Sequence, residues 1–278
     1  MDKPTSFLDI QNAIRIVKEY KKGFITNFYP EVDKINTWID NGQFHIEIMG
    51  DTAFFFRENA EFSYLFYCST TTEALRHALF ELKSMMAGIH LVADIIGKKP
   101  DVQSVVNAFE ANGFYKYATL NRMSRNPFLD ECRNLYPGIK KANLSHSKAV
   151  FNLLHQYFDP IAEQLPTQGE INEWIKSNHL LLFEENSEIL GFVIFDLIGI
   201  TSYLRYWFVH PQHRNKKVGS TLLNEYFKNC SGVKRQLFWV IQTNENAIKR
   251  YKHYGFLSEN LYDFVVTNKD AHYETESN

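Results

Sequence analysis

Apolar residues recur along this chain in two patterns, a spacing of three to four residues typical of helices and short dense runs typical of buried strands. In the first half, "AIRIVKEY" has helical spacing, and a short second helix is expected around Trp38. The strands "FHIEIM", "TAFFFRE" and "SYLFY" follow, and then a longer amphipathic helix, "TEALRHALFELKSMM". The strand "HLVADII" leads into a last helix that should stop at Gly113, because glycine is common just past a helix end.

The second half shows the same order of elements. Helical spacing in "SKAVFNLLHQYF" and around Trp174 is followed by the strands "HLLLFEE", "ILGFVIFDLI" and "SYLRY". The helix "VGSTLLNEYFKNC", the strand "QLFWVI" and a helix that should stop at Gly255 complete the series. Such alternation predicts the α/β (α+β) class, with a central mixed, twisted sheet flanked by helices in each half.

Three sequence matches indicate that the two halves are copies of one fold. "INTWIDN" at 35–41 returns as "INEWIKSN" at 171–178, "SYLFY" at 63–67 as "SYLRY" at 202–206, and "FEANGF" at 109–114 as "YKHYGF" at 251–256. Coincidence in a composition rich in Phe, Tyr and Asn is the alternative. The common order of the matches and their nearly constant spacing, from 136 to 142 residues, argue against it.

The repeat predicts two tandem domains, at residues 1–125 and 141–267. Asn126-Pro127 and Pro137-Gly138 are typical of turns and mark a linker at 126–140. The polar residues 268–278 are expected to form a flexible tail.

A basic turn, "FVHPQHRNKKVGS", joins an aromatic-rich strand to a helix in the second half only. Arg214, Lys216 and Lys217 are followed directly by the helix start at Val218-Gly219-Ser220. A helix N-terminus presents unpaired N–H groups and partial positive charge, and a glycine lets the backbone approach a ligand closely. The turn therefore predicts a pyrophosphate site, although it is neither a Walker loop nor a Rossmann fingerprint.

Two motifs in this half resemble those of the GNAT superfamily of N-acetyltransferases. "V-x-P-x-x-R-x-x-K-V-G-S-x-L-L" at 209–223 is similar to the family's acyl-CoA motif, R/Q-x-x-G-x-G/A, and Arg214 and Gly219 match it. Lys217 stands where the first glycine of that motif is usual. "N-E-N-A-I-K-R-Y-K-H-Y-G-F" at 244–256 is similar to the family's closing motif, N-x-x-A-x-x-x-Y-x-x-x-G-F, and the resemblance covers roughly residues 141 to 266.

The resemblance implies a set of residues that bind acetyl-CoA, which is a co-substrate in this family. Main-chain amides of the turn would hold the pyrophosphate, the preceding strand would pair with the pantetheine arm, and the Lys217 side chain is expected to point to solvent near the phosphate. Tyr251 is the implied catalytic residue, because a phenol with a pKa near 10 is a suitable proton donor to a thiolate near 8–9. The implied cofactor-binding residues are Phe208, Val209, Arg214, Asn215, Lys216, Lys217, Val218, Gly219, Ser220 and Asn244.

The first copy lacks all of these features. "SYLFYCS" runs almost directly into "TTTEALRHAL", with no basic glycine turn between strand and helix. Counted back from the capping glycine, Phe109 takes the position of Tyr251 and Val102 that of Asn244. We therefore expect the N-terminal copy to be degenerate and to have lost acyl-CoA binding.

The general base for amine deprotonation stays open at this stage. The strand "TSYLRYWFV" contains no carboxylate, and a water chain is an alternative to a side chain. The candidate side chains are Asp159, Glu163, Glu184, Glu185 and Asp196.

Composition narrows the class of protein. The formal net charge of −2 argues against general affinity for nucleic acid or for acidic membranes. The N-terminus has no apolar signal segment, and "ILGFVIFDLIGI" is too short for a membrane span. Three distant cysteines suggest no disulfide framework and a reduced cytoplasmic setting. His210 and His213 lack a third ligand nearby, so no metal is expected.

Together these patterns predict an acyltransferase that moves acetyl from acetyl-CoA directly to a primary amine, without a covalent intermediate. The acceptor is left open between small molecules and peptides, and the sequence is compatible with a homodimer. A non-catalytic acyl-CoA-binding regulatory module is the alternative function. An aminoacyl transferase of the peptidoglycan-bridge type, also a double GNAT fold, is a third, disfavoured by the near-neutral charge.

Overall fold

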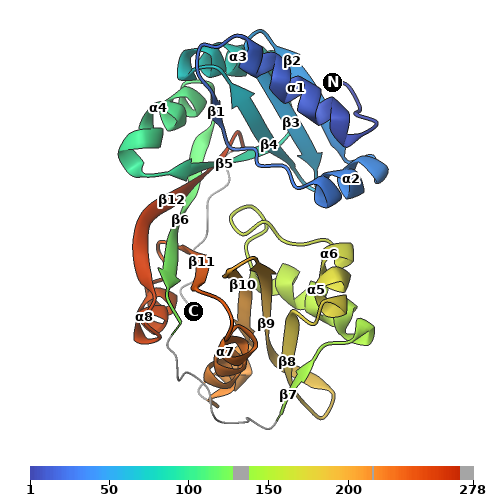
Figure 1. Ribbon diagram of the computed structural model, residues 1–278, viewed down its shortest axis with the longest axis vertical. Coiled ribbons are helices and arrows are strands. Elements are labelled where there is room, and N and C mark those ends of the chain that lie inside the picture. The colour runs from blue at the N-terminus through green and yellow to red at the C-terminus, as the bar shows by residue number, and fades with distance from the viewer. Residues whose placement is uncertain (128–137, 215, 270–278) are drawn as a thin grey trace. The chain divides into compact units, whose positions relative to one another are not determined.

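The computed structural model describes residues 1–127, 138–214 and 216–269. The chain divides into two compact units (Figure 1). The first unit comprises Met1–Leu120 and the segment that starts at Asn260, and the second comprises Asn121–Glu259. The division falls within two long strands, β6 (Tyr115–Arg125) and β12 (Leu257–Thr267), so each of them contributes residues to both units.

The first unit is a mixed sheet with helices on both faces. Its strand order is β2-β3-β4-β5-β12, antiparallel except for the parallel pair β4 and β5, and the short β1 pairs with β4. Its elements are α1 (Phe7–Glu19), β1 (Ile25–Thr26), α2 (Val32–Asp40), β2 (Phe44–Met49), β3 (Thr52–Glu58), β4 (Ser63–Ser69), α3 (Thr72–Met85), β5 (Leu91–Gly97) and α4 (Lys99–Glu110).

The alternation of side chains along a strand explains why both faces of this sheet are covered. Ala53 and Phe55 of β3 pack with α1 and α2, whereas Phe54 and Phe56 pack with α3 and α4. Residues 53–56 of β3 are apolar and buried on both faces, so they form one continuous hydrophobic run in the sequence.

The second unit repeats this plan. Its strands follow the order β6-β11-β10-β9-β8-β7, with β7 to β10 antiparallel and β10 parallel to β11. Its elements are β7 (Ile139–Lys141), α5 (Ser147–Tyr157), α6 (Gln168–Lys176), β8 (Leu180–Glu185), β9 (Glu188–Ile198), β10 (Thr201–Val209), α7 (Val218–Asn229), β11 (Arg235–Ile241) and α8 (Glu245–His253). One face of the sheet packs against α5 and α6, and the other against α7 and α8.

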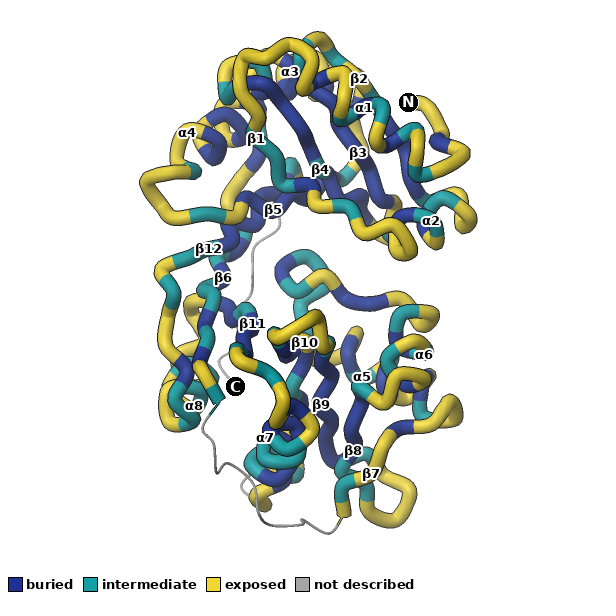
Figure 2. The backbone as a smooth tube through the Cα atoms, viewed as in Figure 1, coloured by how far each residue is buried: buried dark blue, intermediate teal, exposed yellow. Residues whose placement is uncertain are grey.

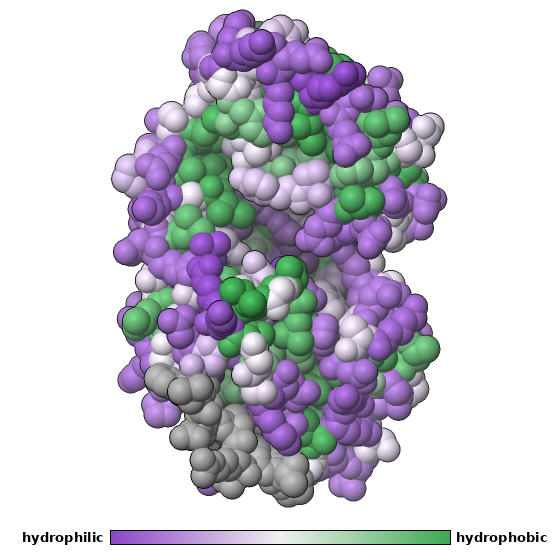
Figure 3. Space-filling view, viewed as in Figure 1, coloured by the Kyte–Doolittle hydropathy of each residue, from purple (hydrophilic) through white to green (hydrophobic). Residues whose placement is uncertain are grey.

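The expected fold class is confirmed, since each unit is a mixed sheet flanked by helices. In Figure 2 the central strands are buried, and exposed residues lie mainly on helix surfaces and loops. Figure 3 shows hydrophilic side chains over most of the visible surface, with apolar residues in smaller patches. Among the described helices, none has both the length and the apolar character needed to cross a bilayer.

The sequence did not predict the long strands β6 and β12 or the short strands β1 and β7. Polar and charged residues interrupt both long strands, and some of these residues are buried and paired. The buried Arg125 of β6, for example, donates from Nε to Gln236 Oε1 at 2.7 Å and from a terminal nitrogen to the carbonyl of Tyr254 at 2.8 Å. Partners so distant in sequence are not visible in a local hydrophobic pattern.

Candidate functional site

The strands β10 and β11 separate in the middle of the second unit. Their parallel pairing joins Thr201–Tyr203 to Arg235–Leu237 and does not extend further along either strand in the described residues. Just beyond this point, the register of β10 with β9 shifts between Leu204 and Tyr206, which marks a bulge. The facing edges of β10 and β11 therefore carry main-chain N–H and C=O groups that an extended ligand can pair with.

The start of α7 follows directly from the free end of β10 and is not capped by a side chain. No described residue accepts a hydrogen bond from the N–H of Val218, Gly219 or Ser220, and the first turn carries no acidic residue. The Ser220 and Thr221 hydroxyls donate back to the carbonyl of Lys217, at 2.9 and 2.8 Å. The helix end thus presents free donors and a partial positive charge to an anion.

The cations of the basic turn surround this helix end. Arg214, Lys216 and Lys217 are exposed, and no described carboxylate pairs with them. Lys216 Nζ lies 3.3 Å from Nδ1 of His213. Asn215, the remaining implied residue of the turn, lies outside the described residues.

Lys217 has a left-handed backbone, with φ 62° and ψ 6°. This conformation explains why glycine is usual here in the family, because a Cβ is strained at positive φ. Lys217 adopts this left-handed backbone and adds an exposed positive charge. The departure from the motif therefore changes the charge and the backbone strain of the turn, and it leaves the path of the backbone as it is.

Gly219 is required by packing against β10. A Cβ at this position would lie 3.1 Å from Cγ2 of Val209 and 3.2 Å from Cζ2 of Trp207. The sequence suggested a glycine that opens space for a ligand, whereas the missing side chain instead lets α7 approach the strand. That approach brings the free N–H groups close to the open edge.

Phe208 contributes to the core on the opposite face of β10. Its ring is 4% exposed and lies 5.0 Å from the ring of Tyr157 and 5.1 Å from that of Phe192. Phe208 can therefore offer a ligand its main chain, whereas Val209 points toward α7.

Tyr251 lies on α8 beside the separated strands. Its ring centroid is 3.9 Å from that of Phe238 and 5.4 Å from that of Trp207, and no described residue is hydrogen-bonded to its hydroxyl. Burial raises the pKa of Tyr251, the charge of Glu163 raises it further, and Arg250 lowers it. The phenol therefore stays protonated at neutral pH and can act as a donor.

Asn244 is the N-cap of α8, with its Oδ1 accepting from the N–H of Ala247 at 3.0 Å. It fixes the start of the helix that carries Tyr251. The amide nitrogen of Asn244 has no acceptor among the described residues. It is therefore the group of this side chain that can take the implied role beside the cofactor.

Of the five candidate carboxylates, three lie on the strands β8 and β9, and each of these is paired or exposed. Asp196 accepts from Nε1 of Trp174 and from Nε of Arg205, both at 2.6 Å. Glu184 lies 2.8 Å from Nζ of Lys140, and Glu185 is exposed at the end of β8.

The other two acids share the loop between α5 and α6. Asp159 accepts from the N–H groups of Ile161 and Ala162, at 2.8 and 2.7 Å. Glu163 has no cationic partner among the described residues, and desolvation raises the pKa of its carboxyl to about 7. The sequence named Glu163 without separating it from the other four, because its burial depends on how the loop folds.

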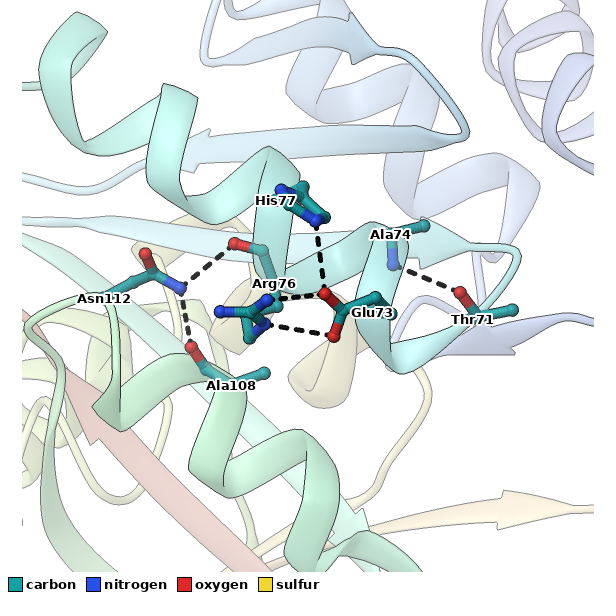
Figure 4. Close-up of polar contacts among 7 residues, drawn as sticks. All are labelled: Thr71, Glu73, Ala74, Arg76, His77, Ala108 and Asn112. Carbon is teal, nitrogen blue, oxygen red and sulfur yellow. Dashed lines mark hydrogen bonds and ion pairs between the residues drawn. The ribbon is translucent and has the colours of Figure 1, made fainter.

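In the first unit the corresponding helix start is closed. Thr71 accepts from the N–H of Ala74 at 3.1 Å, and Glu73 puts a carboxylate into the first turn of α3 (Figure 4). Glu73 is held by Nε of Arg76 at 3.1 Å and by Nε2 of His77 at 3.2 Å. A side-chain cap and a negative charge here oppose the binding of a phosphate.

The strands β4 and β5 of the first unit also separate, after the pairs Ser63–Leu91 and Tyr64–Val92, but the chain itself bridges them. Nδ2 of Asn27 donates to the carbonyls of Leu65 and Asp94, at 3.2 and 2.9 Å. Its Oδ1 accepts from the N–H of Tyr67 at 2.7 Å. The loop between α1 and α2 therefore takes up edge groups of β4 and β5 beyond the point where these strands separate.

Phe109 replaces the phenol of the second unit with a core side chain. It is fully buried, with its ring 5.9 Å from that of Tyr67 and 5.0 Å from that of Phe114. Val102 lies inside α4, so it caps nothing. The Asn112 amide joins α4 to α3 by donating to the carbonyls of Ala108 and Arg76 (Figure 4).

The histidines of the basic turn have separate partners. Nε2 of His210 lies 3.3 Å from the hydroxyl of Tyr157, and Nε2 of His213 lies 3.3 Å from Oε1 of Glu188. Within the described ranges, no group of three or more His, Cys, Asp or Glu side chains could hold a metal ion.

Comparison with protein families finds a match within the second unit. Residues 147–256 match the model of the acetyltransferase (GNAT) family. The comparison with curated proteins found no match. Among solved structures, a tandem GNAT protein from the clavulanic acid biosynthesis pathway gives a TM-score of 0.60 at 11% identity, over 92% of this chain and 93% of that chain.

Two further structures have similar folds. A GCN5-related N-acetyltransferase from Kribbella flavida gives a TM-score of 0.55 at 10% identity, over 94% of this chain and 97% of that chain. One from Sphaerobacter thermophilus gives 0.56 at 12% identity, over 78% and 76%. At these identities the similarity concerns the fold, and its coverage includes the first unit.

Proposed function

Because residues 147–256 match the model of the acetyltransferase (GNAT) family and the chain is similar in fold to a tandem GNAT protein, we propose that the second unit is an N-acetyltransferase. It transfers acetyl from acetyl-CoA to a primary amine of a small molecule or peptide. The observation that carries this proposal is the open edge of β10 leading into the uncapped start of α7.

The residues of this region fit acetyl-CoA. The amide groups of its pantetheine arm can pair with the free main chain of β10 beyond Tyr203, as an added strand does. Its pyrophosphate can accept from the N–H groups of Val218–Ser220, with Arg214, Lys216 and Lys217 supplying positive charge.

Transfer is direct, from the thioester to the amine. Burial raises the pKa of Cys230 to about 12 and of Cys68 to about 11, so neither is a thiolate at neutral pH. The hydroxyl of Ser220 donates to the Lys217 carbonyl and has no base beside it. Cys132 lies outside the described residues.

Tyr251 is the proposed acid for the departing thiolate. Its hydroxyl is unpaired and its pKa is raised, so the proton is present when the thiolate forms. A regulatory module that only binds acyl-CoA needs no such donor, and the unpaired phenol favours an enzyme over that alternative.

The experiment is calorimetry with acetyl-CoA, followed by thiol detection with a panel of primary amines. The panel should include polyamines, aromatic ethylamines, amino-acid amides and short peptides. We expect one equivalent of acetyl-CoA per chain and thiol release that depends on an amine. Two equivalents would contradict the assignment of the first unit as a non-binding copy, and binding without amine-dependent release would favour the regulatory module.

A further inference from the structure

Glu163 lies in the loop that joins α5 to α6, and the loop is tied to β10. The hydroxyl of Tyr206 is 3.1 Å from the carbonyl of Glu163 and 3.0 Å from that of Gln164. Tyr206 is the residue at which the register of β10 resumes after its bulge. The loop is therefore anchored to β10 just beyond the point where the pairing of β10 with β11 ends.

The loop also holds its own shape. Glu163 N–H donates to the carbonyl of Asp159 at 3.0 Å, and Oε2 of Glu163 accepts from the N–H of Asp159 at 3.0 Å. Ala162 and Leu165 on either side are buried. The Glu163 side chain is thus fixed through one of its two oxygens.

The second oxygen, Oε1, is free. No described residue donates a hydrogen bond to Oε1. The Glu163 side chain is only partly buried, and this oxygen keeps some exposure to solvent. Desolvation raises the pKa of Glu163 to about 7, and the charge of Asp159 acts in the same direction. A half-buried carboxylate with an open oxygen can accept a proton at neutral pH.

The Glu163 carboxylate and the Tyr251 phenol interact electrostatically. The charge of Glu163 raises the pKa of Tyr251, although the two residues come from the α5–α6 loop and from α8. An acid and a base from different elements thus lie within electrostatic reach of each other beside the open edge of β10.

We propose that Glu163 is the general base that deprotonates the acceptor amine, with Tyr251 as the acid on the leaving side. This assignment rests on the proposed acetyltransferase function. It also indicates the acceptor class, since a carboxylate base suits an alkylamine that arrives as its ammonium ion.

In the proposed reaction, Glu163 takes one proton from R–NH₃⁺. The neutral nitrogen then forms a C–N bond to the thioester carbonyl carbon. The C–S bond breaks, and Tyr251 gives its proton to the thiolate. The proton that the nitrogen loses on becoming an amide returns Tyr251 to the phenol, and Glu163 releases its proton to solvent.

The first unit provides an internal comparison. The acid in its loop between α1 and α2 is the exposed Glu31, the N-cap residue of α2, and Asn27 of that loop bridges β4 and β5. Phe109 stands in place of Tyr251. A partly buried carboxylate in this loop and the phenol are thus lacking in the same copy, as expected for two groups that serve one reaction.

The test is Glu163→Gln, which keeps an oxygen that can accept from the Asp159 N–H. With the best alkylamine of the panel, we expect kcat/KM at pH 7 to fall about 100-fold or more. The dissociation constant of acetyl-CoA should change less than about threefold. Glu173→Gln, an exposed acid of α6 paired with Lys176, is the matched control and should keep wild-type activity.

Two readouts separate a base from a merely structural residue. Methoxyamine is already neutral at pH 7, so the variant should lose far less activity with it than with the alkylamine. In the wild type, the ¹³C carboxyl resonance that disappears in Glu163→Gln should titrate near pH 7.

The outcomes are distinguishable. Wild-type turnover matched by Glu163→Gln, or a Glu163 resonance that titrates in the ordinary glutamate range, would overturn the role of Glu163 alone. A wild-type protein that binds acetyl-CoA and releases no thiol with any amine would overturn the proposed function and the base together.

Discussion

At the scale of single residues, the second unit differs from the first by a few side chains with large chemical consequences. Tyr251 stands where the first unit has Phe109, and Asn244 caps α8, whereas Val102 lies inside α4 and caps nothing. Glu163 lies within the α5–α6 loop, whereas the acid of the α1–α2 loop is the exposed N-cap residue Glu31.

Tyr251→Phe should separate chemistry from binding. Phenylalanine keeps the ring that contacts Phe238 and Trp207. We expect kcat to fall by about 10²–10⁴, because the proton for the thiolate is lost. Calorimetry should show acetyl-CoA affinity within about threefold of wild type. Tyr254→Phe, at the end of the same helix, is the control, and an unchanged kcat for Tyr251→Phe would remove the phenol from the mechanism.

Lys217→Gly should have opposite effects on stability and on binding. Glycine relieves the positive φ of 62°, so the free energy of unfolding should rise by about 0.5–1 kcal/mol. Acetyl-CoA affinity should fall several-fold and depend less on salt, because one cation near the phosphates is lost. Lys216→Ala removes an equal charge without relieving strain and should weaken binding alone. Tighter binding by Lys217→Gly would mean that the lysine narrows the site.

At the scale of elements, the structure shows which parts of the site are readable from local sequence. The basic turn and the motif ending at Phe256 are contiguous, so the sequence located α7 and α8 with their functional residues. The separation of β10 from β11 and the bridge made by Asn27 depend on register and on a loop path, and no local pattern encodes them. Glu163 stood among five acids for the same reason.

β12 illustrates a different failure of prediction. Asp263 is a buried acid inside this strand. A reading based on hydrophobic residues does not predict a buried strand where a carboxylate interrupts the apolar run. Burial and the nearby charge of Asp94 raise the pKa of Asp263 well above its ordinary value.

Asp263→Asn should therefore stabilise the protein as pH rises. The folded state holds the Asp263 proton above pH 3.8, where the unfolded state releases it, so wild-type stability falls as pH increases through that window. Asparagine does not ionise, and denaturant titrations at pH 8 should show a gain on the order of 1–3 kcal/mol that shrinks at pH 4. Asp40→Asn, at an exposed helix end, should show no such gain. Equal stability of Asp263→Asn and wild type at pH 8 would show that the carboxyl is ionised and paired.

At the scale of the whole molecule, the sequence repeat and the compact units do not coincide at their ends. The repeat suggested domains at 1–125 and 141–267, whereas residues from Asn260 onward belong to the first unit. The last strand of the chain thus completes the sheet of its first half.

This strand placement predicts that residues 1–125 will not fold alone. Tyr262–Thr267 pair with Val92–Gly97 of β5, and Phe264 and Val266 belong to the core built by α3 and α4. Without them β5 has an open edge and the core has a hole, and loss of two large buried side chains costs several kcal/mol.

The measurement is the circular dichroism melt of two fragments. Residues 1–125 alone should melt without cooperativity, whereas the same fragment joined by a flexible linker to residues 257–269 should melt cooperatively. A linked segment with Phe264 and Val266 both replaced by serine serves as the control, since it restores length and main-chain pairing but not the core. A cooperative melt of residues 1–125 alone, equal to that of the linked fragment, would show that the first half does not depend on β12 and that the repeat boundaries are the folding boundaries.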